Sequence, residues 1–264
     1  LLPLVSLVVQ TLGSGLERLD AAYFSNSMRN VVGAGGGAVH AIYGTLIVTG
    51  LTTLISVPIG LLCAIYLVEY GQGRRLARSI TFFVDVMTGI PSIVAGLFAY
   101  ALFGVLFGPG TVNGLAGAVA LSVLMIPTIV RSAEEYLRLV PHELREASYA
   151  LGVPKWRTIL KIVLPTAMAG IVTGVILAIA RVIGETAPLL VTMGYTDSLN
   201  VNPTAHAMTT LPVFVYYQFM QPGEPAAAYL TRAWTGALTL VVIVMLLNAI
   251  GRLVARRFAP KSHA

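Results

Sequence analysis

Long apolar segments alternate with short polar segments along the chain. A helix needs about 20 mainly apolar residues to cross the hydrocarbon core of a bilayer. Residues 1–12 are apolar but shorter, and they predict the trailing part of a first span; the alternative is a signal-peptide core, although its basic region and cleavage site are missing. An all-α integral membrane protein with six spans in one domain, residues 1–264, is therefore expected. The five fuller spans are predicted at residues 43–68, 83–107, 114–130, 167–193 and 234–254.

The composition supports a membrane protein and excludes two other classes. Apolar residues make up 56% of the chain and charged residues 11%, against about 45–50% and about 25% in soluble domains. So few charged residues do not cover the surface of a soluble globule, and so many apolar residues exclude a disordered chain. A single cysteine excludes a disulfide framework and a cysteine-only metal cluster.

The positions of arginine and lysine predict the orientation in the membrane. Three basic residues (Arg18, Arg29 and Arg232) fall on one side, and Arg181 lies inside a predicted span. The thirteen other basic residues lie on the opposite side, which includes the C-terminal end. Because basic residues favour the cytoplasmic side and the number of spans is even, both termini are expected in the cytoplasm. The net charge of +6 is then a consequence of topology, with no need for a nucleic-acid partner. The thirteen basic residues of the cytoplasmic side are Arg74, Arg75, Arg78, Arg131, Arg138, Arg145, Lys155, Arg157, Lys161, Arg252, Arg256, Arg257 and Lys261.

The predicted cytoplasmic loop, residues 131–165, has the pattern of a short helix. Pro141 suits a first helical turn. Glu143 and Glu146 would lie near the positive end of the helix dipole. Gly152 suits the residue after the last turn, and Pro154 prevents a simple continuation. One face of this helix carries Leu144, Ala147, Ser148 and Leu151, at helical spacing. Such a helix, projecting from the membrane, can dock into a groove on another protein.

The same segment resembles the EAA loop of the permeases of ABC importers. Glu146-Ala147-Ser148 is followed at the family's spacing by Gly152, Ile162 and Leu164-Pro165, and it departs only at Ser148, where alanine is usual. The resemblance implies a coupling helix in a cleft of a cytoplasmic ATPase subunit; a solvated helical loop is the alternative. It assigns ATPase coupling to Glu143, Glu146, Ala147, Ser148, Leu151 and Gly152.

A second resemblance narrows the family to the phosphate-specific permeases of PstA type. Residues 181–190, Arg-Val-Ile-Gly-Glu-Thr-Ala-Pro-Leu-Leu, and residues 89–93, Gly-Ile-Pro-Ser-Ile, carry it. It implies a type I importer fold with six spans in a bacterial inner membrane, working by alternating access. The implied partners are a PstC-like permease, two ATPase subunits that hold ATP with magnesium, and an extracytoplasmic phosphate-binding protein. A PstC-type subunit, or a permease for sulfate or molybdate, is the alternative.

Two charged residues, Arg181 and Glu185, fall deep inside the fifth predicted span. A lone charge at that depth costs about 2.5–3.5 kcal/mol on insertion scales. The two side chains, four residues apart, would share one helical face, and Pro188 predicts a kink there. Because the forked donors of arginine suit a tetrahedral oxyanion, we expect Arg181 to line a phosphate path, with Glu185 as its counter-charge and Thr186 as a donor. The alternative is an ion pair that fixes helix packing.

Pro91 and Ser92 interrupt the third predicted span. A helix that begins at Ser92 would aim backbone N–H groups at an anion, which makes Ser92 a candidate for the same path. A simple packing kink is the alternative.

The missing motifs limit the chemistry of this chain. It has no G-x-x-x-x-G-K-[ST] sequence, so ATP would have to bind a partner subunit. It also lacks H-E-x-x-H and G-x-S-x-G, and its four histidines are scattered. A non-catalytic permease without a metal site is therefore expected. An intramembrane enzyme or a channel that uses Arg181 and Glu185 is the alternative, and it leaves the EAA-like spacing unexplained.

Overall fold

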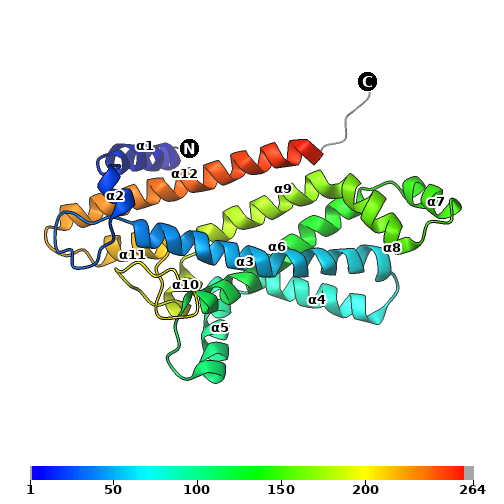
Figure 1. The fold of residues 1–264 in the computed structure, drawn as a ribbon, viewed down its shortest axis with the longest axis horizontal. Coiled ribbons are helices and arrows are strands. Elements are labelled where there is room, and N and C mark those ends of the chain that lie inside the picture. The colour runs from blue at the N-terminus through cyan, green and yellow to red at the C-terminus, as the bar shows by residue number, and fades with distance from the viewer. Residues whose placement is uncertain (1, 259–264) are drawn as a thin grey trace. The chain divides into compact units, whose positions relative to one another are not determined.

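A computed structural model describes residues 2–258, which form helices and no strand (Figure 1). Leu1 and residues 259–264, among them Lys261, lie outside the described residues. The helices are α1 (Leu2–Leu16), α2 (Ala21–Ser25), α3 (Val39–Ile65), α4 (Arg75–Gly89), α5 (Ser92–Phe107), α6 (Gly114–Arg138), α7 (His142–Ala150), α8 (Lys155–Thr158), α9 (Leu164–Ile183), α10 (Ala187–Thr192), α11 (Leu211–Met220) and α12 (Ala226–Phe258). Two π-helical turns, η1 (Tyr66–Tyr70) and η2 (Ile159–Val163), extend α3 and precede α9.

The chain is grouped into two compact units, each built from three stretches of sequence. Unit 1 comprises Leu1–Thr52, Pro91–Ser122 and Val182–Met245. Unit 2 comprises Thr53–Ile90, Val123–Arg181 and Leu246–Ala264. Four of the boundaries fall inside long helices, so that α3, α6, α9 and α12 contribute residues to both units, and the boundary between Ile90 and Pro91 falls between α4 and α5.

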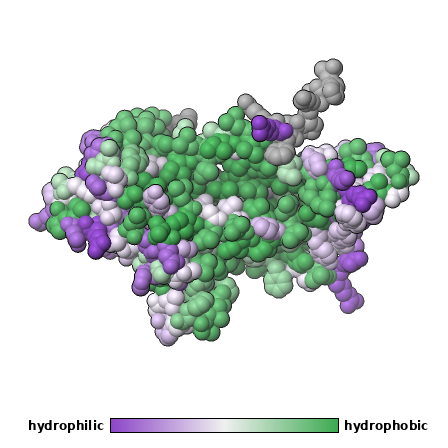
Figure 2. Space-filling view, in the orientation of Figure 1, coloured by the Kyte–Doolittle hydropathy of each residue, from purple (hydrophilic) through white to green (hydrophobic). Residues whose placement is uncertain are grey.

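Four continuous helical segments are long and apolar enough to cross a membrane, and α4 with α5 forms a bent pair that together meets the same criterion. The four segments are Val39–Tyr70, Gly114–Arg138, Lys155–Ile183 and Ala226–Ala255. The apolar part of α1, Val5–Leu16, is too short to count among them. Apolar residues cover much of the visible face, and hydrophilic residues gather over α7 and α8 (Figure 2). The count of six spans stays a prediction.

The predicted span 83–107 is not one helix. The chain bends by 109° between α4 and α5. Ile90 has extended backbone angles, φ −71° and ψ 128°, because a following proline disfavours the helical conformation. The span prediction also missed the start of α4 at Arg75, since the exposed Arg75 and Arg78 made its first turns look like a loop.

The predicted span 167–193 differs from the structure at both ends. Its helix already begins at Lys155, continues through η2, and ends at Ile183. Residues 184–186 are not helical, and Pro188 occupies the first turn of α10. Proline is accommodated in a first turn because no intrahelical partner is needed for its nitrogen. The predicted interruption is therefore a complete break between two helices.

The predicted cytoplasmic loop 131–165 is shorter than expected. The helix α6 continues to Arg138, and α8 begins at Lys155, which leaves α7 between two short links. Polar side chains alone do not end a helix, so α6 continues to Arg138, three residues before Pro141.

Small residues allow close helix packing within each unit. In unit 2, a Cβ atom on Gly60 would lie 2.7 Å from Cγ2 of Ile129. The core there is formed by Ala64, Ala133, Leu137, Val140, Val163, Ala167 and Ile171. In unit 1, the backbone N–H of Leu211 donates to Oγ1 of Thr45, 2.8 Å away. Close approach through small residues and inter-helix hydrogen bonds is the usual way in which helices associate in lipid.

Arg232 lies in unit 1 and is fully buried. Its Nη1 donates to the carbonyl oxygens of Gly33 and Gly35, at 2.7 and 3.1 Å, and its Nε donates to Oε1 of Gln218 at 2.9 Å. One arginine therefore ties the loop before α3 to α11 and α12.

Candidate functional site

The helix α7 is bounded by the residues that the sequence indicated. Pro141 caps its first turn, and Leu151 ends it with a backbone N–H that donates to the carbonyl oxygen of Ala147. Gly152 has a φ of +73°, a conformation that costs glycine nothing and strains other residues. Pro154 then caps the first turn of α8. The chain therefore leaves α7 in a sharp turn, and α7 remains short.

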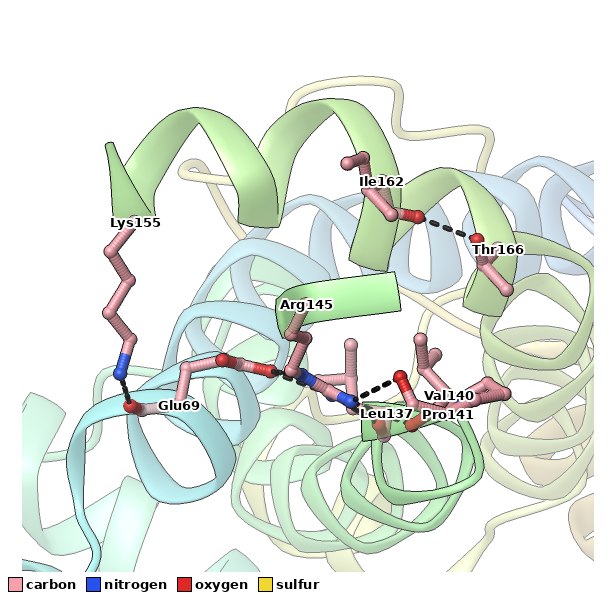
Figure 3. A network of polar contacts seen from close by, with 8 residues as sticks. All are labelled: Glu69, Leu137, Val140, Pro141, Arg145, Lys155, Ile162 and Thr166. Atoms are coloured by element: carbon pink, nitrogen blue, oxygen red, sulfur yellow. Dashed lines mark hydrogen bonds and ion pairs between the residues drawn. The ribbon is translucent and has the colours of Figure 1, made fainter. Parts of the chain in front are cut away.

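Arg145 attaches α7 to two other elements of unit 2 (Figure 3). Its side chain is buried, and Nε and Nη2 both donate to Oε1 of Glu69, at 3.1 and 2.9 Å. Nη1 and Nη2 also donate to the carbonyl oxygens of Val140 and Leu137, at 2.6 and 3.0 Å. The last carbonyls of a helix have no intrahelical partner. Arg145 therefore satisfies the end of α6 and neutralises a buried carboxylate.

Lys155, in α8, also contacts Glu69. Its Nζ donates to the backbone carbonyl oxygen of Glu69 (Figure 3) and lies 4.9 Å from the centre of the Tyr70 ring. The side chain and the main chain of Glu69 are thus both bound by cationic residues. A buried charge is tolerated only when it is paired and hydrogen-bonded, and Glu69 meets both conditions.

Unlike Ala147 and Leu151, with which the sequence predicted a shared helical face, Ser148 is not exposed. Its side chain is buried and shares a hydrogen bond of 2.8 Å with the hydroxyl of Thr158, which is also buried. Arg145 and Ser148, three residues apart, therefore form the inward face of α7. The serine at position 148, where the family usually has alanine, therefore has a hydrogen-bond partner in α8.

The outward face of α7 carries exposed residues of mixed character. Leu151 is 83% exposed and Leu144 is 41% exposed. The side chains of Glu143, Glu146 and Ala147 are exposed as well. A partner protein can therefore make apolar contacts with the glycine, alanine and leucine residues of this face and charged contacts with its carboxylates.

A hollow of about 450 Å³ lies beside α7 in unit 2. Glu146, Tyr149 and His142 line it from α7, and Gln72 lines it from the η1 side. Partial burial and, after it, the nearby Glu69 carboxylate raise the pKa of the Tyr149 hydroxyl. That hydroxyl therefore remains a neutral hydrogen-bonding group at physiological pH.

Arg181 and Glu185 are placed differently from the prediction of one helical face, which is wrong. Arg181 lies in the last turn of α9 with an exposed side chain, whereas Glu185 follows the helix and is half-buried. The salt bridges formed among residues 2–258 involve neither side chain. The break after Ile183 ends the four-residue periodicity that would have aligned the two residues.

The first turns of α5 and α10 lie side by side in unit 1 (Figure 1). A Cβ atom on Gly96 would lie 2.6 Å from Cα of Pro188, so the two backbones touch. Ser92 precedes Gly96 by one turn and is half-buried. Thr186 is half-buried at the start of α10, and its carbonyl oxygen accepts from the N–H groups of Leu189 and Leu190. The two interrupted segments therefore begin close together.

Sequence reasoning missed the roles of Arg145 and Glu69. The sequence indicated Arg145 only as part of the basic excess on the predicted cytoplasmic side, and it indicated no partner for Glu69. The three-residue spacing of Arg145 and Ser148, which places both on one face of α7, is the signal from which an inward face could have been predicted. Asp85 is exposed and pairs with Arg131. Across residues 2–258, no three His, Cys, Asp or Glu side chains gather as metal ligands would.

Comparison with known proteins places the chain in a family. Residues 56–263 match the family described as binding-protein-dependent transport system inner membrane component. The chain belongs to this family. The sequence-based assignment to ABC transporter permeases is thereby confirmed, and the chain is a multi-pass membrane protein.

Relatives match over most of the chain. The phosphate transport system permease protein PstA 1 of Mycobacterium tuberculosis (strain CDC 1551 / Oshkosh) is 47% identical, over 97% of this chain and 85% of the relative. PstA proteins of Mycobacterium leprae and Yersinia pestis are 45% and 38% identical, over 95% and 98% of this chain and 82% and 85% of theirs. The resemblance to PstA-type permeases is therefore confirmed along nearly the whole sequence.

Solved structures share the fold. The inward-facing MetNI methionine ABC transporter matches with a TM-score of 0.70 and 24% identity, over 84% of this chain and 96% of that chain. An amino acid ABC transporter matches with a TM-score of 0.63 and 19% identity, over 83% and 92%. The all-helical type I importer permease fold that was predicted is confirmed.

Proposed function

We propose that the chain is the PstA-type permease subunit of an ATP-driven phosphate importer. The observation that carries this proposal is the 47% identity over 97% of the chain to a relative named as a phosphate permease. With a PstC-like permease the chain forms the phosphate path, and an extracytoplasmic phosphate-binding protein delivers the anion. It lies in a bacterial inner membrane with both termini in the cytoplasm, since thirteen basic residues fall on that side.

The helix α7 is the docking element for a cytoplasmic ATPase subunit. Its outward face is exposed, and its inward face is bound to the membrane-spanning helices through Arg145 and Ser148. Two ATPase subunits serve the two permeases, and they hold ATP with magnesium. This chain carries no catalytic residue of its own and responds to ATP binding and hydrolysis by alternating access.

The phosphate path uses residues at the interrupted helices. Arg181 lies in the last turn of α9, before the break at residues 184–186, and its exposed side chain has no ion-pair partner among residues 2–258. Glu185 counterbalances its charge during transport, and Thr186 and Ser92 offer hydroxyl donors. Interrupted helices leave backbone groups free to meet a substrate, and a forked guanidinium suits a tetrahedral oxyanion.

Purification from membranes tests this function. The tagged chain is expected to co-purify with a second permease and an ATPase, each identified by mass spectrometry. In proteoliposomes, the binding protein loaded with phosphate should stimulate ATP hydrolysis, whereas sulfate and molybdate should not. Stimulation by sulfate or molybdate would reassign the substrate, and phosphate flux without any ATPase would favour a channel.

Replacement of Arg181 by glutamine is expected to reduce phosphate uptake about tenfold or more, because a charge-assisted contact with the anion is lost. Arg181→Lys should recover part of the uptake, since it keeps the charge but loses the fork. Uptake of labelled phosphate by the assembled complex is the measurement. Arg252→Gln, which changes another exposed arginine of unit 2, is the matched control. Normal uptake by Arg181→Gln would reject its place in the path.

A further inference from the structure

We infer that the Arg145–Glu69 pair is the link through which movement of α7 reaches the α3 span. This inference rests on the proposed docking of an ATPase at α7. Arg145 acts as a positioning residue, because it touches neither phosphate nor nucleotide. Glu69 is the residue before the last in the helical segment Val39–Tyr70, so a force on its carboxylate acts on the end of a whole span.

The α3 span needs such a link, because the sequence does not supply one. Three residues, Leu139, Val140 and Pro141, separate α6 from α7, and a short turn joins α7 to α8. Covalent continuity therefore carries a push from α7 to α6 and to α9. Glu69 and Arg145 are 76 residues apart in the sequence, and their contact is spatial. Without it, the end of α3 is held by Lys155 of α8 and by the apolar packing of Ala64 against α6 and α9, and neither of these interactions involves α7.

The link is stiff because of its burial and its geometry. The side chains of Arg145 and Glu69 are 10% and 4% exposed. Two donors of the guanidinium reach one carboxylate oxygen, while the carbonyl oxygens of Leu137 in α6 and Val140 in the link after it also accept from the guanidinium. Charge-assisted bonds away from water are strong, and rearrangement would leave a buried charge unpaired. By contrast, the Arg131–Asp85 pair is 37% and 60% exposed, and water replaces its contacts readily.

The end of the span is built to receive this contact. The π-helical turn η1 places Glu69 near its end, where the last carbonyls of a helix have no partner within it. Lys155 binds the Glu69 carbonyl and Arg145 binds the Glu69 side chain. Three elements, α6, α7 and η1, thus meet at one guanidinium, and they move together or the pair breaks.

Glu69→Gln tests the link in the purified complex of both permeases and both ATPases. We expect ATPase subunits to co-purify in the normal ratio and ATP hydrolysis to continue. Phosphate transported per ATP hydrolysed should fall about tenfold, within the range of coupling between distant sites. Arg145→Lys, which keeps the charge but loses the fork, should lower the same ratio. Asp85→Asn, in the exposed ion pair of the same unit, is the matched control and should leave the ratio unchanged.

The outcomes separate the link from a structural role and from the proposed function. An unchanged transport-to-hydrolysis ratio in Glu69→Gln would overturn the link. A parallel loss of complex yield, hydrolysis and transport would also overturn it, since the pair would then serve folding alone. If the wild-type chain brings down no ATPase, the proposed function itself fails.

A distance measurement tests the same link without a variant of the pair. Spin labels at Gln72 and Ala150, both exposed in unit 2, report the separation of η1 and α7 after Cys63→Ser removes the native thiol. In the assembled complex, this separation should be the same with ATP absent and with ATP trapped. A change between the two states would show that α7 moves independently of the α3 span and would overturn the inference.

Discussion

Gly96→Ala is expected to reduce phosphate uptake at least tenfold and to lower the thermal unfolding midpoint of the purified complex. The added Cβ would lie 2.6 Å from Cα and 2.9 Å from the carbonyl oxygen of Pro188. Both are backbone atoms, so no rotamer change relieves the overlap, and α10 has to move away from α5. Overpacking of this kind costs about 1–3 kcal/mol. The starts of the two interrupted helices, with Ser92 and Thr186, would separate as a result.

Gly104→Ala is the matched control for this prediction. It lies in the same helix, α5, and a Cβ atom there would meet nothing within 4 Å. Because alanine favours a helix over glycine by about 1 kcal/mol, Gly104→Ala should unfold at an equal or higher temperature and transport normally. Equal behaviour of the two variants would show that the contact between α5 and α10 does not position the path.

Glu146→Lys is expected to abolish stable binding of the ATPase subunits while the chain still inserts into the membrane. Glu146 is exposed on α7 and has no salt-bridge partner among the described residues. Reversal of its charge should therefore leave the fold of unit 2 intact. Loss of a charged contact at an interface costs about 2–5 kcal/mol, which predicts at least tenfold weaker ATPase binding. Co-purification of the ATPase with the tagged chain measures the effect.

Two further variants sharpen the docking prediction. Gly152→Val forces a branched residue into a φ of +73° and should change the exit of the chain from α7, also weakening ATPase binding. Glu135→Lys makes the same charge reversal at an exposed glutamate of α6 and should bind the ATPase normally. Full ATPase recovery with Glu146→Lys would contradict the coupling role of α7.

The sequence predicted what depends on local chemistry. The apolar segments indicated the long helices, Pro91 indicated the break before α5, and the pattern from Pro141 to Gly152 indicated α7 almost to the residue. Each of these features is decided by neighbours within a turn or two. The helix ends were less accurate, because polar residues such as those at the end of α6 continue a helix as readily as they leave it.

The remaining features depend on contacts between distant parts of the chain. Nothing near Glu69 in the sequence indicates that Arg145 will neutralise it, and nothing near Ser148 indicates Thr158. The prediction that Arg181 and Glu185 share a helical face was wrong, because α9 ends at Ile183. Their proposed place in the phosphate path, with Ser92 and Thr186, stays a prediction.

The hydrogen bond between Ser148 and Thr158 has a consequence for chimaeric transporters. A graft of residues 142–152 from a permease with alanine at the position of Ser148 would remove one of the two hydrogen bonds of the buried Thr158 hydroxyl and leave only its long bond, 3.4 Å, to the carbonyl oxygen of Pro154. Loss of one hydrogen bond costs about 0.5–1.5 kcal/mol. The smallest segment that can be exchanged between permeases without this loss is therefore residues 142–158, in which α7 and the first turn of the next span are inherited together.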